Sequence, residues 1–194
     1  MIAYRSNRAF TEQSEAKFEE YLREDGLEAI SVIRSQQGRR DGGPVRESYS
    51  RYAKALVRSG DTGHISDRRI GLALEMLAEP DLSTTAADEE YATFQLLHQG
   101  KPLAGALVKA MRLAGHDAEL AARTGADGRA SFPLGQSGLW RISAVHMTRA
   151  PDRVAAPWDS LWASLTFELS SFHATGTVST PAPERETYCV NRVR

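Results

Sequence analysis

Histidines are the side chains in this sequence best suited to bind a transition metal ion. The chain has five: His64, His98, His116, His146 and His173. Imidazole nitrogen is a favoured ligand of such ions, but several ligands must converge within about 2.0 to 2.6 Å of one ion. No two of these histidines are two or four residues apart, so neither one strand nor one helix presents a ready pair. A metal site therefore requires distant segments to meet.

His98 and His146 are the strongest candidates, because each alternates with apolar residues in a segment typical of a strand. They approach each other if their strands are neighbours, and the alternative for each is a hydrogen-bonded core histidine. His64 follows a glycine in a polar segment, where an ordinary loop residue is the alternative to a ligand. We take His98, His146 and His64 as candidate metal ligands.

Residues for nucleophilic or acid–base catalysis are not arranged in any familiar pattern. The chain has no Gly-x-Ser-x-Gly motif, and its single cysteine, Cys189, has no histidine close by in the sequence. The carboxylates of Glu19 and Glu20, and those of Glu89 and Glu90, are adjacent in sequence, which is poor geometry for an acid and a base flanking one bond. We therefore predict that the protein is not an enzyme.

Two tryptophans are candidates for a ligand or partner surface. Trp162 falls on the outward, polar side of the alternation over residues 161–169, and Trp158 lies just before it. A pair of exposed indoles can stack against a ligand. Burial against the helical region is the alternative, because a tryptophan hides a large area when it packs.

Composition and charge exclude some partners. The formal net charge is −1 and the isoelectric point is near 6.5, so no whole-molecule field attracts nucleic acid or an anionic membrane. No segment approaches the roughly 20 apolar residues of a membrane-spanning helix. A single cysteine cannot form an internal disulfide, which is compatible with the cytosol and with the periplasm alike.

The first 60 residues have helical periodicity. Ser14 can cap a helix that ends near Gly26, a second helix follows up to about Gly38, and a third fits Arg46 to Arg58. The third rests on Tyr49, Tyr52, Ala53, Leu56 and Val57, which form a stripe with helical spacing.

After residue 70 the apolar period changes to two, which is typical of half-buried strands. The sequence thus predicts a mainly β protein with a helical N-terminal part: an antiparallel β-sandwich preceded by about three helices. Residues 94–98 are expected to pair with residues 104–111 across the turn at Gly100, and a second hairpin is expected around Asp127 and Gly128.

The polar segment 81–90 divides the chain into regions. We expect a helical region over 1–80, which is an insertion in, or a remnant of, an N-terminal β domain whose first part lies upstream of Met1. The β-sandwich domain covers 91–169. Residues 170–194, rich in Ser, Thr, Pro and Arg, are expected to form an irregular tail.

The motifs together resemble a bacterial family, the NikM-like proteins, whose members are often described as periplasmic components of cobalt or nickel ABC transport. The resemblance is carried by Tyr4-Arg-Ser-Asn7, by Lys17-Phe-Glu-Glu-Tyr-Leu-Arg-Glu-Asp-Gly-Leu27, by Arg46-Glu-Ser-Tyr-Ser-Arg-Tyr-Ala-Lys-Ala-Leu56, by the turns at Gly100 and Thr124, and by residues 161–169. It implies an immunoglobulin-like or transthyretin-like sandwich and a possible nickel or cobalt ion. It also implies an exported, periplasmic protein, whereas the chain as written has no signal peptide and would be cytoplasmic.

We therefore expect a non-catalytic exported binding or accessory protein for nickel or cobalt uptake, whose partners are the metal ion or components of metal transport. A structural or protein-interaction module of the adhesion type, without metal chemistry, is the alternative. Distance between the histidines, together with an apolar patch near Trp162, would favour the alternative.

Overall fold

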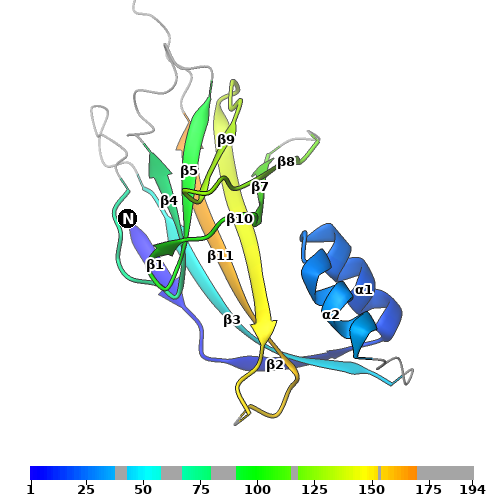
Figure 1. The fold of residues 1–194 in the computed structure, drawn as a ribbon. Coiled ribbons are helices and arrows are strands. Elements are labelled where there is room, and N and C mark those ends of the chain that lie inside the picture. Colours follow the sequence, from blue (N-terminus) through cyan, green and yellow to red (C-terminus); the bar gives the residue numbers. More distant parts are fainter. Residues whose placement is uncertain (38–42, 58–66, 80–90, 115–117, 153, 170–194) are drawn as a thin grey trace, which may run out of the picture.

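Two packed β-sheets and a pair of helices make up the fold in the computed structural model (Figure 1). The structure describes residues 1–37, 43–57, 67–79, 91–114, 118–152 and 154–169. The helices are α1 (Glu15–Glu24) and α2 (Glu28–Gln36). The strands are β1 (Ile2–Arg5), β2 (Ala9–Gln13), β3 (Val45–Ala55), β4 (Leu74–Glu79), β5 (Ala92–His98), β6 (Lys101–Pro102), β7 (Leu107–Arg112), β8 (Leu120–Arg123), β9 (Arg129–Phe132), β10 (Gly138–Arg149) and β11 (Trp158–Leu169).

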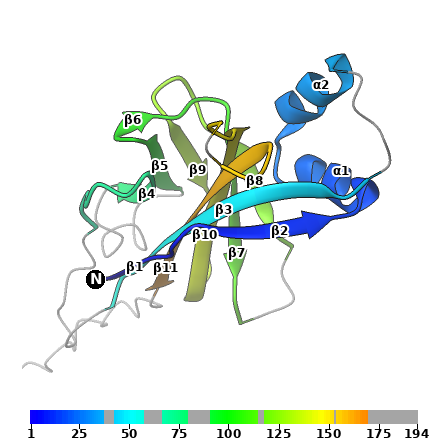
Figure 2. The same cartoon turned by 90° about the horizontal axis from the view of Figure 1, so that it is seen from below.

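The large sheet has seven strands, in the order β1, β3, β11, β10, β7 and β8, with β2 also paired to β3. The small sheet has four strands, in the order β4, β5 and β6, with β9 also paired to β5. Figure 2 shows the small sheet on one side of the long strands β3, β10 and β11 and the helices on the other. The molecule is thus a two-sheet sandwich with an additional helical layer, which confirms the predicted mainly β fold and its sandwich arrangement.

Two apolar clusters hold these layers together. Between the sheets, Phe94 and Phe132 of the small sheet pack with Ile142, Leu165 and Phe167 of the large sheet. Between the large sheet and the helices, the cluster comprises Phe18, Leu22, Leu27, Ile30, Val45, Val145, Met147 and Trp158. Alternate residues of β10 and β11 face each cluster, because successive side chains of a strand point to opposite faces.

The predicted third helix is wrong: residues 45–55 form the strand β3. Its side chains from Ser48 to Lys54 alternate between buried and more exposed, as in a strand. The inward positions include serines and a lysine rather than only apolar residues, so the period of two was hidden. The aromatic and alanine residues happened to fall at helical spacing.

The prediction of a wholly antiparallel sandwich is also wrong, because β3 and β11 are parallel over Glu47 to Ala55. The strand predicted over 104–111 is β7, which pairs with β10 and β8 in the large sheet and not with β5. Across the turn at Gly100, β5 pairs instead with the two-residue β6. Likewise, the turn at Gly128 joins β8 of one sheet to β9 of the other rather than closing a hairpin.

Both sheets draw strands from either side of the segment 81–90. The large sheet combines β1, β2 and β3 with later strands, and β4 pairs with β5 in the small sheet. The expected tail, 170–194, lies outside the described residues. No helix in the described part of the chain is long and apolar enough to cross a membrane.

Candidate functional site

His98 and His146 come from different sheets and meet between them. His98 is the last residue of β5, where Gln99 and Gly100, with φ of 49° and 76°, turn the chain into β6. His146 lies on β10, four residues after Ile142 and six after Trp140. Because these spacings are even, His146 shares the inward side of the strand with both. The sandwich architecture, rather than local sequence, brings the two imidazoles together.

The ring centroids of His98 and His146 are 4.5 Å apart, with an angle of 54° between the ring planes. The two histidines therefore approach each other, although their strands belong to different sheets and are not the paired neighbours that the sequence-based expectation required. Burial, together with the smaller effect of the charge that His98 would carry, lowers the pKa of His146 to about 4. Burial also lowers the pKa of His98. Both rings are neutral at pH 7, which is the form that binds a metal ion.

No other described side chain completes this pair. Among the described residues, no hydrogen bond is formed by either ring, and no group of three or more His, Cys, Asp or Glu side chains is arranged to hold a metal ion. His64, the third candidate ligand, lies outside the described residues. The pair thus offers two imidazole ligands, and a metal ion bound there needs further ligands from solvent or from elsewhere.

The two candidate tryptophans lie under the helices rather than as an exposed pair. Trp158 is 2% exposed and belongs to the cluster between α1, α2 and the large sheet. Trp162 is partly buried; its ring stacks on Tyr21 of α1 at 5.6 Å, and its indole N–H donates to Ser160 Oγ at 3.0 Å. Trp158 therefore packs in the core, as the alternative interpretation expected, although it also lines one surface pocket; Trp162 lines two others.

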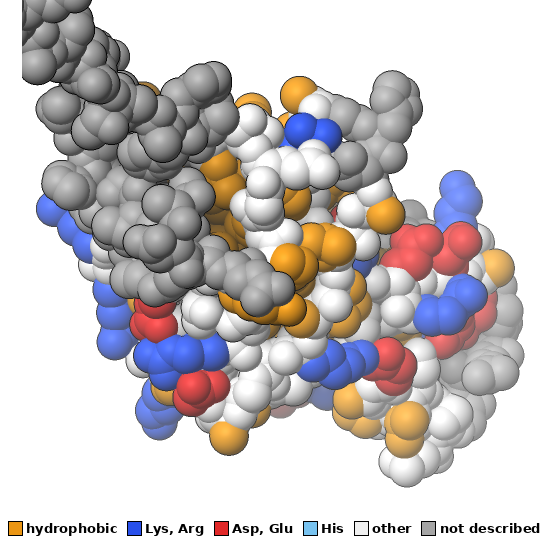
Figure 3. All heavy atoms as spheres, turned by 90° about the horizontal axis from the view of Figure 1, so that it is seen from above, with side chains coloured by type: hydrophobic (Ala, Val, Ile, Leu, Met, Phe, Trp, Pro, Cys, Tyr) orange, Lys and Arg blue, Asp and Glu red, His pale blue; other side chains and the backbone are white. Residues whose placement is uncertain are grey.

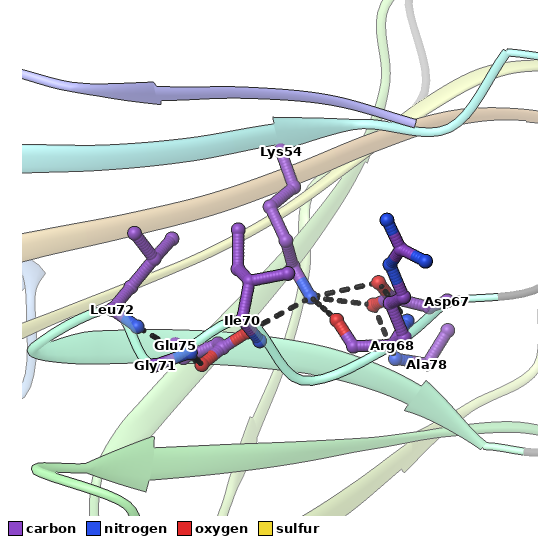
Figure 4. A network of polar contacts seen from close by, with 8 residues as sticks. All are labelled: Lys54, Asp67, Arg68, Ile70, Gly71, Leu72, Glu75 and Ala78. Atoms are coloured by element: carbon purple, nitrogen blue, oxygen red, sulfur yellow. Dashed lines mark hydrogen bonds and ion pairs between the residues drawn. The ribbon is translucent and has the colours of Figure 1, made fainter.

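A buried ion-pair cluster, which sequence reasoning missed, links the large sheet to the start of the small one (Figure 4). The Lys54 amine lies 2.8 Å from each oxygen of Asp67 and 3.5 Å from Glu75 Oε1. The three side chains are at most 1% exposed. Lys54 also donates to the carbonyl oxygen of Arg68 at 3.4 Å. A charged residue at an inward strand position was the only signal of this cluster in the sequence.

The carboxylate of Glu75 is held by backbone as well as by lysine. It accepts hydrogen bonds from the backbone N–H groups of Ile70, Gly71 and Leu72 at 2.8, 2.9 and 3.1 Å. Gly71 has a φ of 80°, and this left-handed conformation lets the three amides point at one acceptor. Because each charge in the cluster has partners, we interpret it as a structural link between β3 and the segment before β4.

A further buried carboxylate, that of Glu47, lies on the helical side of the large sheet and is 2% exposed. It accepts hydrogen bonds from the hydroxyl groups of Tyr21, at 3.3 Å, and Ser160. Burial raises the pKa of Glu47, and the neighbouring Asp159 carboxylate raises it further, although the hydroxyl donors act in the opposite direction. Among the described residues, no Lys or Arg forms an ion pair with Glu47.

On one face of the molecule, charges of both signs lie side by side (Figure 3). On the face shown in Figure 3, lysine and arginine side chains lie beside aspartate and glutamate side chains. Arg129 with Glu79, and Arg123 with Glu28, are exposed pairs of this kind. Such pairs contribute little to stability and mark no binding surface.

A helix-flanked β-sandwich with a half-buried histidine pair between its sheets is the class that the fold and the site define. The chain belongs to the family described as domain of unknown function DUF4198, which it matches over residues 3–148. No curated protein and no solved structure gave a match. The family match ends within β10, before β11, although β11 lies between β3 and β10 in the large sheet.

Proposed function

We propose that this chain is a non-catalytic binding protein that takes a late first-row transition metal ion, nickel or cobalt, at the His98 and His146 pair. The observation that carries the proposal is the 4.5 Å separation of two half-buried imidazole rings. Rings with lowered pKa values are neutral at physiological pH, so a metal ion does not have to displace protons to bind.

The choice of ion and the cellular role rest on ligand chemistry and on the sequence resemblance. Imidazole suits nickel, cobalt, copper and zinc, and the resemblance to the NikM-like proteins favours nickel or cobalt among them. We extend the same proposal to an exported, periplasmic accessory role in metal uptake and to an immunoglobulin-like or transthyretin-like ancestry of the sandwich.

Titration calorimetry with nickel and cobalt chloride tests the proposal. The unmodified chain is expected to bind one ion, and His98→Ala and His146→Ala are each expected to weaken binding by about tenfold or more, the scale seen when metal sites lose a supporting group. His173→Ala, which also removes one imidazole, is the matched control and should retain binding. Absence of heat with both metals, or equal binding by all variants, would refute the metal proposal.

A structural or protein-interaction module is the second candidate, and the edge strand β1 favours it. β1 ends the large sheet, and its residues Ile2 and Tyr4 are 64% and 59% exposed. An apolar edge strand is a template for pairing with another chain. This candidate predicts concentration-dependent self-association in sedimentation experiments, which Ile2→Lys should remove. A chain that stays monomeric at high concentration would count against it.

A further inference from the structure

A pocket of about 510 Å³ opens on the helical side of the large sheet, away from the histidine pair. The helices cover the sheet around Val145, Met147 and Trp158, and the pocket lies beyond them, between the end of α1 and strand β1. Its volume falls within the range of about 300 to 1,000 Å³ that is usual for small-molecule sites.

The floor of the pocket is one row of residues across five neighbouring strands. In register, Tyr4 of β1 pairs with Ala53 of β3, Ala53 with Ser164 of β11, Ser164 with Ser143 of β10, and Ser143 with Lys109 of β7. The three central side chains are small, whereas the two outer ones are large. This sequence of sizes hollows the sheet surface and explains why the pocket forms here.

Arg141 lines this pocket, two residues before Ser143 on β10, and no carboxylate among the described residues pairs with it. Its Nε is the one buried side-chain nitrogen or oxygen without a hydrogen bond among the described residues. Its other contact is a weak one, from a terminal nitrogen to the sulfur of Met111 at 3.7 Å. The two acidic side chains at the pocket, Asp25 and Glu119, instead lie 2.9 and 3.6 Å from Lys109.

The charge balance of the pocket is positive. Three cationic residues, Arg51, Lys109 and Arg141, line it with two acidic ones, which leaves one positive charge. Lys109 is neutralised by both acids, and the Arg51 guanidinium lies over the Trp162 ring at 5.8 Å. Arg51 and Arg141 are therefore the two cations of the pocket that no described carboxylate pairs with, and of these Arg141 is the one whose buried nitrogen lacks a hydrogen bond.

We infer that this pocket binds a small organic carboxylate, which pairs with the Arg141 guanidinium. A planar guanidinium matches a carboxylate with two parallel hydrogen bonds, and such a pair would satisfy the buried Nε. The hydroxyl groups of Ser143 and Ser164 supply neutral hydrogen bonds to the ligand, and Trp162 and Tyr4 provide apolar walls. This site is separate from the histidine pair, which lies between the sheets.

Calorimetric titration with benzoate, succinate and inorganic phosphate, at constant ionic strength, tests the inference. At least one carboxylate is expected to bind saturably to the unmodified chain. Arg141→Gln should weaken that binding about tenfold or more, the scale of a lost charge-assisted hydrogen bond. Arg23→Gln removes the same charge from an exposed position on α1 and is the matched control. It should bind as the unmodified chain does.

Two further variants keep the test decisive if Arg141→Gln fails to fold. Arg141→Lys retains the charge but loses the planar fork, and Ser143→Leu fills the floor without changing charge; both should weaken binding. His146→Ala should leave carboxylate binding unchanged, which separates this site from the metal proposal. Absence of binding by both carboxylates, preference for phosphate, or equal binding by the Arg141 and Arg23 variants would overturn the inference.

Discussion

The imidazole rings of His98 and His146 lie 4.5 Å apart although one belongs to the small sheet and the other to the large sheet. A metal ion bound to both rings would therefore connect the two layers of the sandwich. Ligand binding to the folded state alone stabilises that state in proportion to the logarithm of ligand concentration. Metal binding at this pair thus couples directly to the stability of the fold.

The pH dependence of metal binding should reveal the lowered pKa values. Because the pKa of His146 is about 4 and that of His98 lies below its ordinary value of 6.5, protons compete weakly near neutrality. Nickel affinity is expected to change little between about pH 8 and pH 6.5 and to fall as the pH decreases further. Calorimetry in non-coordinating buffers across this range measures it. A steep loss of affinity already above pH 7 would contradict the assignment of the metal site to these two rings.

The buried cluster around Lys54 should be essential for stability. Lys54→Met leaves the carboxylates of Asp67 and Glu75 buried without a cation, and such a change is expected to lower the free energy of unfolding by about 3 to 5 kcal/mol. Arg46→Met, on the same strand, removes an exposed pair with Glu12 and should cost at most about 1 kcal/mol. Urea denaturation of both variants provides the comparison. Equal losses would show that the cluster is not a structural link.

Burial of Glu47 should make the stability of the protein decrease as the pH rises. The pKa of Glu47 is raised in the folded state, so its contribution to stability is fully present below its unfolded pKa of 4.5 and is lost as the pH rises through the folded value. Glu47→Gln keeps an oxygen to accept from Tyr21 and Ser160 but cannot ionise. The variant should therefore become more stable, relative to the unmodified chain, as the pH rises from acid to neutral.

Urea denaturation at several pH values measures this difference. Glu12→Gln, at an exposed position, should show no such trend and is the control. If the stabilities of the Glu47 variant and the unmodified chain change in parallel with pH, the pKa of Glu47 is not raised in the folded state.

The sequence was informative where one face of a strand is uniformly apolar. Alternation identified β10 and β11 correctly, because residues between the sheets are apolar on both strands, and it placed His146 on the inward face. It failed at β3, whose inward face carries serines and the paired Lys54. The local pattern of apolar and polar residues cannot reveal that Lys54 is buried, because its charge is stabilised inside the protein only by Asp67, which comes from another segment.

The order of strands was beyond the sequence for a different reason. The parallel pairing of β3 with β11 joins segments far apart in the chain, and no local turn specifies it. The Arg141 pocket likewise depends on a row of five strands in register. No single segment contains the pattern of small and large side chains that forms its floor.

Gly128 is expected to be intolerant of any side chain. Its φ is 75°, and a Cβ atom there would lie 2.7 Å from the carbonyl oxygen of Leu96 and 3.0 Å from the backbone nitrogen of Leu103. Gly128→Ala should therefore cost about 2 kcal/mol or more, equivalent to about 4 to 8 °C in melting temperature. Gly135→Ala, where a Cβ meets no atom within 4 Å, is the control for thermal unfolding. A Gly128 variant as stable as the control would exclude this close packing.

Strand β11 should be indispensable although the family match ends before it. The match covers residues 3–148, whereas β11 (Trp158–Leu169) lies between β3 and β10 and contributes the fully buried Leu165 and Phe167. A chain ending at residue 149 would expose the facing edges of β3 and β10 and lose much of the core between the sheets. It is expected to aggregate or to unfold without cooperativity.

A chain ending at residue 170 retains every described strand and is the matched comparison, with near-ultraviolet circular dichroism and urea unfolding as the measurements. Phe167→Ala in the full chain is the milder test, with an expected loss of about 3 to 5 kcal/mol for a buried phenylalanine. Cooperative unfolding of the shorter chain, with native near-ultraviolet signal, would mean that the matched segment folds alone and that β11 is an addition to it. The central place of β11 argues that the chain ending at residue 149 will aggregate or unfold without cooperativity, because both β3 and β10 use β11 to satisfy their backbone hydrogen bonds.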